Sequence, residues 1–545
     1  MVMPYVGVEA MNQHLIEISA AVSPGAIALL IIDDAGWHRS HQLVLPHNIV
    51  LLKLPPYAPE LNPTENIWQY LRANALANSV WDSYEAIVNA CCNAWRGLIA
   101  KPGVITSIGT RQWAQSVFRT TGIRSVGKLL RYNGAAHLLT IAPTRSGKGV
   151  GAVIPNLLTA DRSVLCIDPK GENARITALT RGKFGPVYVL DPFEISGRPG
   201  AAFNPLGELD HLSPDLAEDA ALLADALVYD PPGQSGDAHW NEEAKALITG
   251  LILYVACHSK PAHQNLATVR HFLTCSSVAA FIQLKRMEDS DAAGGLIRRA
   301  AHRHMGKNER ERAGVLSTAQ RHTHFLDSAR INATMDRSDF RFSDLKRSKA
   351  TVFLVLPPER LDTYARWLRL MVSQGIHAVA RAPSTGAPPI LFLLDEFAAL
   401  GRLEAVERAF GLMAGYVLQL WPVLQDKHQL WSTYGQRAGT FMSNAGVVQI
   451  FNVGDVETAS WVSKTMGSTT MTYQTTSTGS SERGLSSEKT KSTTTSTHLT
   501  RRDLMTPDEI MRLDSSLEIL LQQGQAPVIA AKVRYYAEAE FQGLF

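Results

Sequence analysis

Two apolar runs that each end in charged residues carry the chemistry of this sequence. The first is His137-Leu-Leu-Thr-Ile-Ala-Pro-Thr-Arg-Ser-Gly-Lys-Gly149, and the second is Ile390-Leu-Phe-Leu-Leu-Asp-Glu-Phe397. An apolar strand that enters a small-residue turn ending in Gly-Lys directs backbone N–H groups and one ammonium group at the phosphates of a nucleotide. We therefore expect Lys148 on the β- and γ-phosphates, Asp395 on Mg²⁺ and Glu396 beside the attacking water. The turn residues expected around the phosphates are Thr144, Arg145, Ser146, Gly147, Lys148, Gly149 and Val150.

The turn departs from the usual phosphate-binding pattern at two positions. Ala142 occupies the place of the first glycine, and Gly149 occupies the place of the hydroxyl residue that would bind Mg²⁺. The alternative interpretation is an ordinary strand-to-helix turn that contains Gly-Lys by chance. Asp395 and Glu396 argue against this alternative, because both carboxylates lie where a buried apolar run stops and charged groups there need a partner.

Several short motifs occur together and in the order found in one known family. They are Ala142-Pro-Thr-Arg-Ser-Gly-Lys-Gly149, Ile154-Pro-Asn-Leu-Leu158, Asp168-Pro-Lys-Gly-Glu-Asn173, Asp191-Pro-Phe193, Phe203-Asn-Pro-Leu206 and Leu394-Asp-Glu-Phe397. With these motifs, the chain from about Arg124 to its C-terminus resembles the TraG-type coupling proteins of conjugation and type IV secretion.

The resemblance implies an α/β fold with a RecA-like P-loop motor and an inserted all-helical domain that contacts DNA or the relaxase. It implies ATP and Mg²⁺ as cofactors, Lys148 as the phosphate lysine, Asp395 as the metal ligand and Glu396 as the base. Gln425 matches the glutamine that senses the γ-phosphate. The implied partners are single-stranded DNA, the relaxase of the relaxosome, components of the type IV secretion channel and further copies of the chain in a homo-hexamer.

The sequence differs from this family in two places. The family usually has Gly-Tyr-Gly-x-Arg where this chain has Gly415-Tyr-Val-Leu-Gln419, so the arginine is absent. The family is also anchored in the inner membrane by helices near its N-terminus. Here the longest apolar candidates, Gly25–Ile32 and Ala246–Cys257, are shorter than the roughly 18 to 20 residues that a span needs. We therefore expect a location in the cytoplasm or at the periphery of the inner membrane.

The first 115 residues resemble a different family, the mariner-related DDE transposases, over the C-terminal half of such an enzyme. The likeness rests on Ala28–Ser40, an apolar strand ending in a carboxylate, and on Leu51–Trp68, an apolar run followed by a proline-rich turn. The resemblance implies a partial RNase H-like module in which Asp33 is the second metal-binding carboxylate and Glu65 the third. No first carboxylate is available, since only Glu9 and Glu17 precede Asp33. A complete small nuclease domain is the alternative interpretation.

The order of apolar runs predicts the domain organisation. Short β-branched and apolar runs alternate with helical segments, as a parallel α/β sheet requires. We predict a junction at residues 116–135, a motor formed by residues 136–209 and 341–545, and an all-helical insertion at 210–340. Residues 466–500 are rich in serine and threonine and have few apolar residues to bury, so we expect a flexible loop or a hairpin tip there.

Composition excludes little but agrees with this organisation. The formal net charge of +3 is too small to indicate nucleic-acid binding by itself, and the five cysteines show no metal-ligand spacing. The sequence therefore predicts a coupling-protein ATPase fused to a transposase fragment. One alternative is an inactive or decoy nucleotide-binding protein. A second alternative, a DDE recombinase, requires the first of three metal-binding carboxylates, which the sequence lacks.

Overall fold

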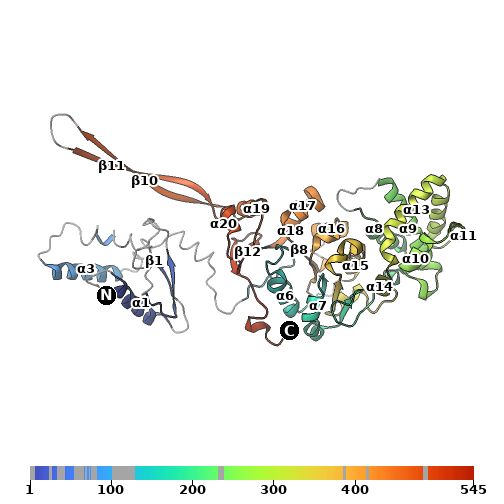
Figure 1. Ribbon diagram of the computed structural model, residues 1–545, viewed down its shortest axis with the longest axis horizontal. Helices are drawn as coiled ribbons and strands as arrows, with labels where there is room; N and C mark the ends of the chain where they lie inside the picture. The colour runs from blue at the N-terminus through green and yellow to red at the C-terminus, as the bar shows by residue number, and fades with distance from the viewer. Residues whose placement is uncertain are drawn as a thin grey trace. The chain divides into compact units, whose positions relative to one another are not determined.

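The chain consists of two compact units, Met1–Ile123 and Arg124–Phe545 (Figure 1). The computed structural model describes residues 7–23, 28–32, 43–53, 67, 70–72, 74, 83–100, 129–230, 238–383, 388–412, 416–482 and 489–545.

The described part of the N-terminal unit includes a short pair of parallel strands and the helices α1 and α3. Its elements are α1 (Val8–Ala21), β1 (Ala28–Ile32), β2 (Ile49–Lys53) and α3 (Tyr84–Ile99). β1 and β2 pair in parallel along their whole length, as expected for the core of an α/β module. Asp33 and Glu65, the two carboxylates predicted for this unit, lie outside the described residues.

The second unit is built on one nine-stranded sheet. Its strands are β3 (His137–Ile141), β4 (Val164–Asp168), β5 (Val187–Leu190), β6 (Thr351–Val355), β7 (Ile390–Leu394), β8 (Leu418–Leu424), β9 (Ala445–Phe451), β12 (Leu517–Gln522) and β13 (Val528–Ala531). The strand order is β13-β12-β9-β3-β8-β7-β4-β6-β5. Neighbours are parallel from β9 to β5, which agrees with the predicted parallel sheet.

The parallel arrangement does not extend to one edge of the sheet, which the sequence did not predict. β12 runs antiparallel to β9, and β13 runs antiparallel to β12. The connection between β12 and β13 is short and contains Gly524 with a φ of 74°. A turn this short can join only antiparallel strands, because a parallel connection needs a dozen or more residues.

Apolar side chains cover both faces of the central strands. β4, β6, β7 and β8 are buried along their entire length. In β7, Phe392 and Leu394 belong to the large apolar cluster on one face, and Leu391 and Leu393 belong to a second cluster on the other. This alternation follows from the two-residue period of a strand. A strand that is buried on both faces has apolar residues at consecutive positions, as β7 does, and such a run is easily recognised in the sequence.

Helices pack against each face of the sheet. α15 (Leu361–Arg381) contributes apolar residues to the cluster that contains Phe392. α6 (Ile154–Thr159) and α7 (Glu172–Phe184) contribute to the opposite cluster. The sheet is therefore the middle layer of a three-layer α/β unit.

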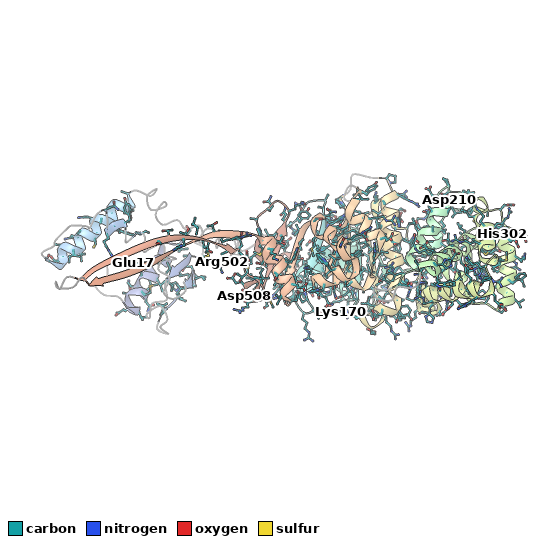
Figure 2. All side chains as sticks on the ribbon, turned by 90° about the horizontal axis from the view of Figure 1, so that it is seen from above. Glu17, Lys170, Asp210, His302, Arg502 and Asp508 are labelled. Atoms are coloured by element: carbon teal, nitrogen blue, oxygen red, sulfur yellow. The ribbon has the colours of Figure 1, made fainter. Side chains whose placement is uncertain are left out.

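An all-helical domain is inserted between β5 and β6. Its main helices are α8 (Leu216–Leu227), α9 (Ala238–His258), α10 (Leu266–Thr274), α11 (Ser277–Glu288), α12 (Leu296–Met305), α13 (Glu309–Thr323) and α14 (Ala329–Ala333). The described part of residues 210–340 contains no strand. Asp210 and His302 mark this domain in Figure 2. The apolar run Ala246–Cys257 lies in α9 and is largely buried, and no helix of the described residues is long and apolar enough to cross a bilayer.

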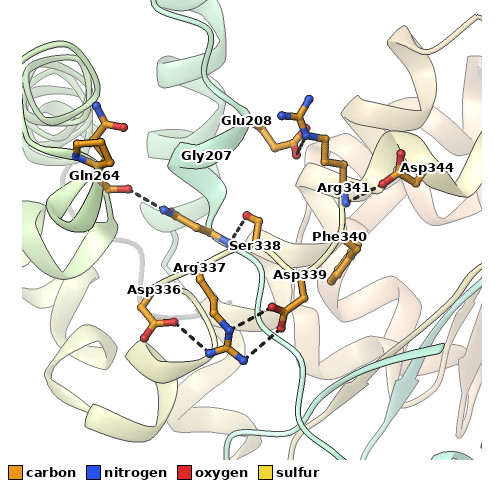
Figure 3. Close-up of a pocket in the computed structure, with 12 residues that line it drawn as sticks. Gly207, Glu208, Gln264, Asp336, Arg337, Ser338, Asp339, Phe340, Arg341 and Asp344 are labelled. Carbon is orange, nitrogen blue, oxygen red and sulfur yellow. Dashed lines mark hydrogen bonds and ion pairs between the residues drawn. The ribbon is translucent and has the colours of Figure 1, made fainter. Parts of the chain in front are cut away.

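The two chain segments that enter and leave the insertion are bonded to each other. The N–H of Phe203 donates to the carbonyl of Thr334 at 2.8 Å, and the N–H of Asp339 donates to the carbonyl of Ala202 at 3.0 Å. A pocket of about 520 Å³ lies at this crossing (Figure 3). Arg337 forms ion pairs with Asp336 and Asp339 within the pocket. Charged side chains that line the pocket are therefore paired with one another.

The Ser/Thr-rich segment forms a long hairpin. β10 (Ser468–Glu482) and β11 (Lys489–Asp503) pair antiparallel, with Ser468 opposite Asp503. Of the two expectations for residues 466–500, a flexible loop or a hairpin tip, the strand pairing fits the hairpin, and both strands extend far along the segment. Threonine is β-branched and favours strands, and the backbone groups of each strand that face the other strand are paired in the ladder.

A row of polar side chains crosses four strands at the antiparallel edge. Trp421 on β8 donates to Thr140 on β3 at 2.8 Å, and the Thr140 hydroxyl donates to Gln449 on β9 at 2.9 Å. The Gln449 amide then donates to the carboxylate of Glu518 on β12 at 2.6 Å. Burial raises the pKa of Glu518 to about 7, although the Gln449 hydrogen bond and the charge of Lys532 oppose the shift.

We predict that Glu518→Gln changes the pH dependence of stability. The folded chain binds the Glu518 proton more tightly than the unfolded chain, so this group lowers the free energy of unfolding as pH rises from 4.5 to about 7. Glutamine removes that effect. The melting temperature of the Glu518→Gln variant minus that of the parent protein should therefore increase from pH 5 to pH 8. Thermal scans at several pH values measure this difference. The exposed Glu538→Gln variant is the control, and an equal pH profile for both variants would contradict the prediction.

Candidate functional site

The predicted phosphate-binding residues form one continuous turn at the carboxyl end of β3. The turn leads into a π-helical segment, Gly149–Val153, and then into α6. Arg145 and Gly147 have positive φ angles of 65° and 90°. Mixed left- and right-handed conformations at successive residues turn their N–H groups toward one side and create a concave site for an anion. The turn around Arg145 and Gly147 therefore has alternating backbone conformations of the kind found in anion-binding turns.

Lys148 contacts both carboxylates of the second predicted motif. Its Nζ lies 2.9 Å from Asp395 Oδ1 and 2.5 Å from Glu396 Oε1. β3 and β7, the strands that carry these motifs, are separated in the sheet only by β8. Parallel strands bring their carboxyl ends to the same edge, where ligands bind in open α/β sheets. The fold therefore joins groups that are 248 positions apart in the sequence.

Gln425 completes this group from the end of β8. Its side-chain amide donates to Glu396 Oε2 at 3.1 Å. Its backbone N–H donates to the Gln429 side chain at 2.9 Å, which fixes the start of the following helix. Glu396 itself adopts a left-handed conformation with a φ of 49°. Such strain in a residue other than glycine occurs preferentially at functional sites, and here it turns the Glu396 carboxylate toward Lys148 and Gln425.

Burial and charge act in opposite directions on the Lys148 ammonium group. Burial lowers the pKa of Lys148, but the adjacent charges of Asp395 and Glu396 outweigh burial and raise it. Burial raises the pKa of Asp395, against the opposing effect of Lys148. Lys148 is therefore fully charged at neutral pH. Two carboxylates share one ammonium group, so the site attracts a further cation.

The residues present fit a magnesium ion only in part. Asp395 offers a carboxylate oxygen, the ligand type that Mg²⁺ prefers, and its side chain is only 12% exposed. Gly149 supplies no hydroxyl ligand, but the Ser146 hydroxyl oxygen in the same turn is buried without a hydrogen-bond partner. The neighbouring carboxylate, Asp168, accepts the N–H of Ala174 at 2.8 Å and caps α7. Among the described residues, Asp395 is therefore the carboxylate that would hold Mg²⁺, and the hydroxyl of Ser146 is available in the turn that carries Lys148.

Gln419 occupies the position where the predicted pattern has an arginine. It lies in β8, and its buried amide donates to the carbonyls of Gly134 and Ala136 at 3.0 and 2.6 Å. These bonds hold the segment that leads into β3. Gln419 therefore acts within its own chain and supports the phosphate-binding strand.

One residue near the site, Arg369, gave no signal in the sequence. Arg369 lies on α15 and donates to the carbonyls of Leu400 and Arg402 at 2.6 and 2.7 Å. Its guanidinium also lies over the ring of Tyr229, 3.9 Å from the ring centre. Leu400 ends the short helix that follows Glu396. Arg369 therefore fixes the chain just beyond the two carboxylates and links it to Tyr229, which follows α8 in the helical insertion.

Comparison with known proteins identifies two families in this chain. The family model described as conjugative DNA transfer of the type IV secretory system matches residues 98–543. A conjugal transfer protein TraG from Escherichia coli is 30% identical over 76% of this chain and 69% of its own length. The VirD4 protein of Rhizobium radiobacter is 29% identical over 78% of this chain and 61% of its own length. The chain thus spans about three fifths to seven tenths of these relatives.

Solved structures show the same fold at low sequence identity. The conjugative coupling protein TrwB lacking 70 N-terminal residues is 16% identical, with a TM-score of 0.56 over 73% of this chain and 85% of its own. TrwB in complex with ADP and Mg²⁺ is 17% identical with the same TM-score, over 74% of this chain and 86% of its own. The RecA-like fold with a helical insertion is therefore confirmed.

The N-terminal residues match a separate family. The model described as DDE superfamily endonuclease matches residues 5–88. An uncharacterized protein, y4pE/y4sA of Sinorhizobium fredii, is 51% identical over 21% of this chain and 84% of its own length. The two family matches do not overlap, which confirms that the chain joins two kinds of protein. The conjugative match begins at residue 98, ahead of the limit expected from the motifs, and the exact junction stays a prediction.

We predict that Arg369→Met destabilises the second unit. Methionine fills a similar volume but leaves the carbonyls of Leu400 and Arg402 without a donor, and unsatisfied buried groups cost roughly 1–3 kcal/mol each. A loss of about 2–4 kcal/mol should appear in urea unfolding, with faster amide exchange after Glu396. Arg381→Met at the exposed end of the same helix is the matched control. Equal midpoints for both variants would contradict the assigned role.

Proposed function

Because this chain belongs to the conjugative DNA transfer family of type IV secretory systems, we propose that it binds and hydrolyses ATP with Mg²⁺ to recruit or move single-stranded DNA. In this proposal the DNA travels with its relaxase to the secretion channel. The contact of Lys148 with Asp395 and Glu396 is the observation that carries the proposal. Solved TrwB complexes with ADP and Mg²⁺, and with a non-hydrolysable ATP analogue, support the same ligands here.

The geometry suggests how the site works. The Lys148 ammonium group moves from the carboxylates to the β- and γ-phosphates when ATP enters the turn. Glu396 then loses its strongest partner and is free to accept a proton from the attacking water. Gln425 already touches Glu396 and can orient that water or sense the γ-phosphate. Asp395 would hold Mg²⁺, and the ion would neutralise negative charge on the phosphates.

The helical insertion carries several basic residues that could contact DNA or the relaxase. The basic side chains of the helical insertion are the obvious candidates for phosphate contact. Several of them already pair with carboxylates of the same domain: Lys285 with Glu288, Arg298 with Asp291, and Arg303 and Lys307 with Glu243. Such pairing favours a solvated helix face for these residues. We therefore assign the DNA and relaxase contacts to the assembled homo-hexamer and not to this cluster alone.

Two substitutions should separate nucleotide binding from hydrolysis. Lys148→Ala removes the cation from the phosphates, so nucleotide affinity and turnover should fall together. Glu396→Gln keeps the size of the side chain but removes its basicity, so binding should survive while hydrolysis falls by about 10²–10⁴. Titration with a fluorescent nucleotide, beside phosphate release, measures both quantities.

Matched controls make this result specific. Lys170→Ala, at an exposed position after β4, and Glu404→Gln, at an exposed position in α16 (Glu404–Leu412), should leave both quantities unchanged. A Glu396→Gln protein that turns over ATP at the parent rate would show that another group is the base.

We predict that single-stranded DNA stimulates ATP turnover by promoting assembly of a ring. If neighbouring copies complete each site, turnover per chain should rise with both DNA and protein concentration. Phosphate release and light scattering after size-exclusion chromatography measure the two effects together. Nucleotide binding without any turnover, with or without DNA, would favour the inactive or decoy alternative. Glu396→Gln gives the background rate.

A further inference from the structure

The C-terminal part of the chain reaches the phosphate-binding turn through Lys532. This residue follows β13, and its Nζ donates to the backbone carbonyl of Ser146 at 2.9 Å. The same ammonium group donates to the Asn452 side chain and lies over the ring of Phe451, 4.6 Å from the ring centre. Lys532 therefore joins the turn after β3 to the end of β9. Nearly four hundred positions separate Lys532 from Ser146.

The carbonyl of Ser146 is an important atom in this turn. It lies between Arg145 and Gly147, which both have positive φ angles. The concave anion site depends on N–H groups, and not carbonyl oxygens, facing the phosphates. A carbonyl oxygen that accepts a hydrogen bond from an ammonium group cannot turn toward a phosphate without losing that bond. Lys532 therefore favours the phosphate-binding form of the turn.

Lys532 is itself held firmly in place. Its backbone N–H donates to the carbonyl of Ser516 at 2.7 Å. The carbonyl of the next residue, Val533, lies so close to Gly151 that a Cβ there would be 3.1 Å from it. Farther along, Phe541 is buried against Ile154 in α6. The C-terminal segment thus packs along the helix that follows the turn.

We propose that Lys532 is a positioning residue of the nucleotide site, which holds the Ser146 carbonyl so that the turn can receive the phosphates of a nucleoside triphosphate. This inference rests on the proposed function, because it specifies how the same site binds its ligand. Lys532 acts on the backbone of the turn and has no part in the hydrolysis step. Its loss should therefore weaken binding and leave the chemistry intact.

The test compares Lys532→Met with Lys532→Arg in the full chain. Methionine keeps the apolar stem on Phe451 but removes the donor, whereas arginine keeps a cationic donor. The Kd for a fluorescent ATP analogue and the KM for ATP should rise about ten-fold in Lys532→Met, the effect of losing one charged hydrogen bond. The kcat at saturating ATP should stay within about two-fold, and Lys532→Arg should restore much of the affinity. Lys464→Met, at an exposed position in α19 (Val456–Met466), is the matched control.

The possible outcomes are distinct. An unchanged Kd in Lys532→Met overturns the inference, and so does a loss of kcat with lowered melting temperature and unchanged KM. Lys148→Ala is measured in the same titration. If Lys148→Ala loses nucleotide and Lys532→Met does not, the inference alone fails. If the parent protein binds no nucleotide, the proposed function and the inference fail together.

Discussion

The ion pairs between Lys148 and the carboxylates of Asp395 and Glu396 are the interaction on which the site depends. A buried carboxylate is costly without a partner, and two of them end the same buried strand. Lys148 meets this demand only because β3 and β7 are parallel and one strand apart. The central sheet, the buried apolar strands and the helices on both faces keep those two strand ends at fixed positions.

Two other buried or half-buried cations support the same site in a different way. Arg369 and Lys532 both donate to backbone carbonyls of loops near the site. A carbonyl that is bound in this way fixes the path of its loop without neutralising the charges that the chemistry uses. Arg369 holds the loop after the carboxylates, and Lys532 holds the turn that carries Lys148. The side chains of Lys148, Asp395 and Glu396 thus supply the charged groups of the site, whereas Arg369 and Lys532 hold the backbone that positions them.

The chain also joins two families whose functional demands differ. Residues 5–88 match the DDE superfamily endonuclease family, and residues 98–543 match the conjugative DNA transfer family. The described part of the first unit contains a parallel strand pair, and the second unit contains the whole of the nucleotide-site geometry. The proposed ATPase is therefore a property of the second unit.

The sequence by itself determined the parts in which local pattern and function coincide. Lys148, Asp395 and Glu396 were predicted because they follow recognisable apolar runs. Gln425 was predicted from the resemblance to the coupling proteins, and the helical insertion from its periodicity and the same resemblance. The antiparallel edge, the Ser/Thr-rich hairpin, and the contacts of Arg369 and Lys532 were decided only by the tertiary structure. These features depend on pairing between segments that are distant in the sequence. An arginine or lysine in a sequence does not indicate which backbone carbonyl will accept its hydrogen bond.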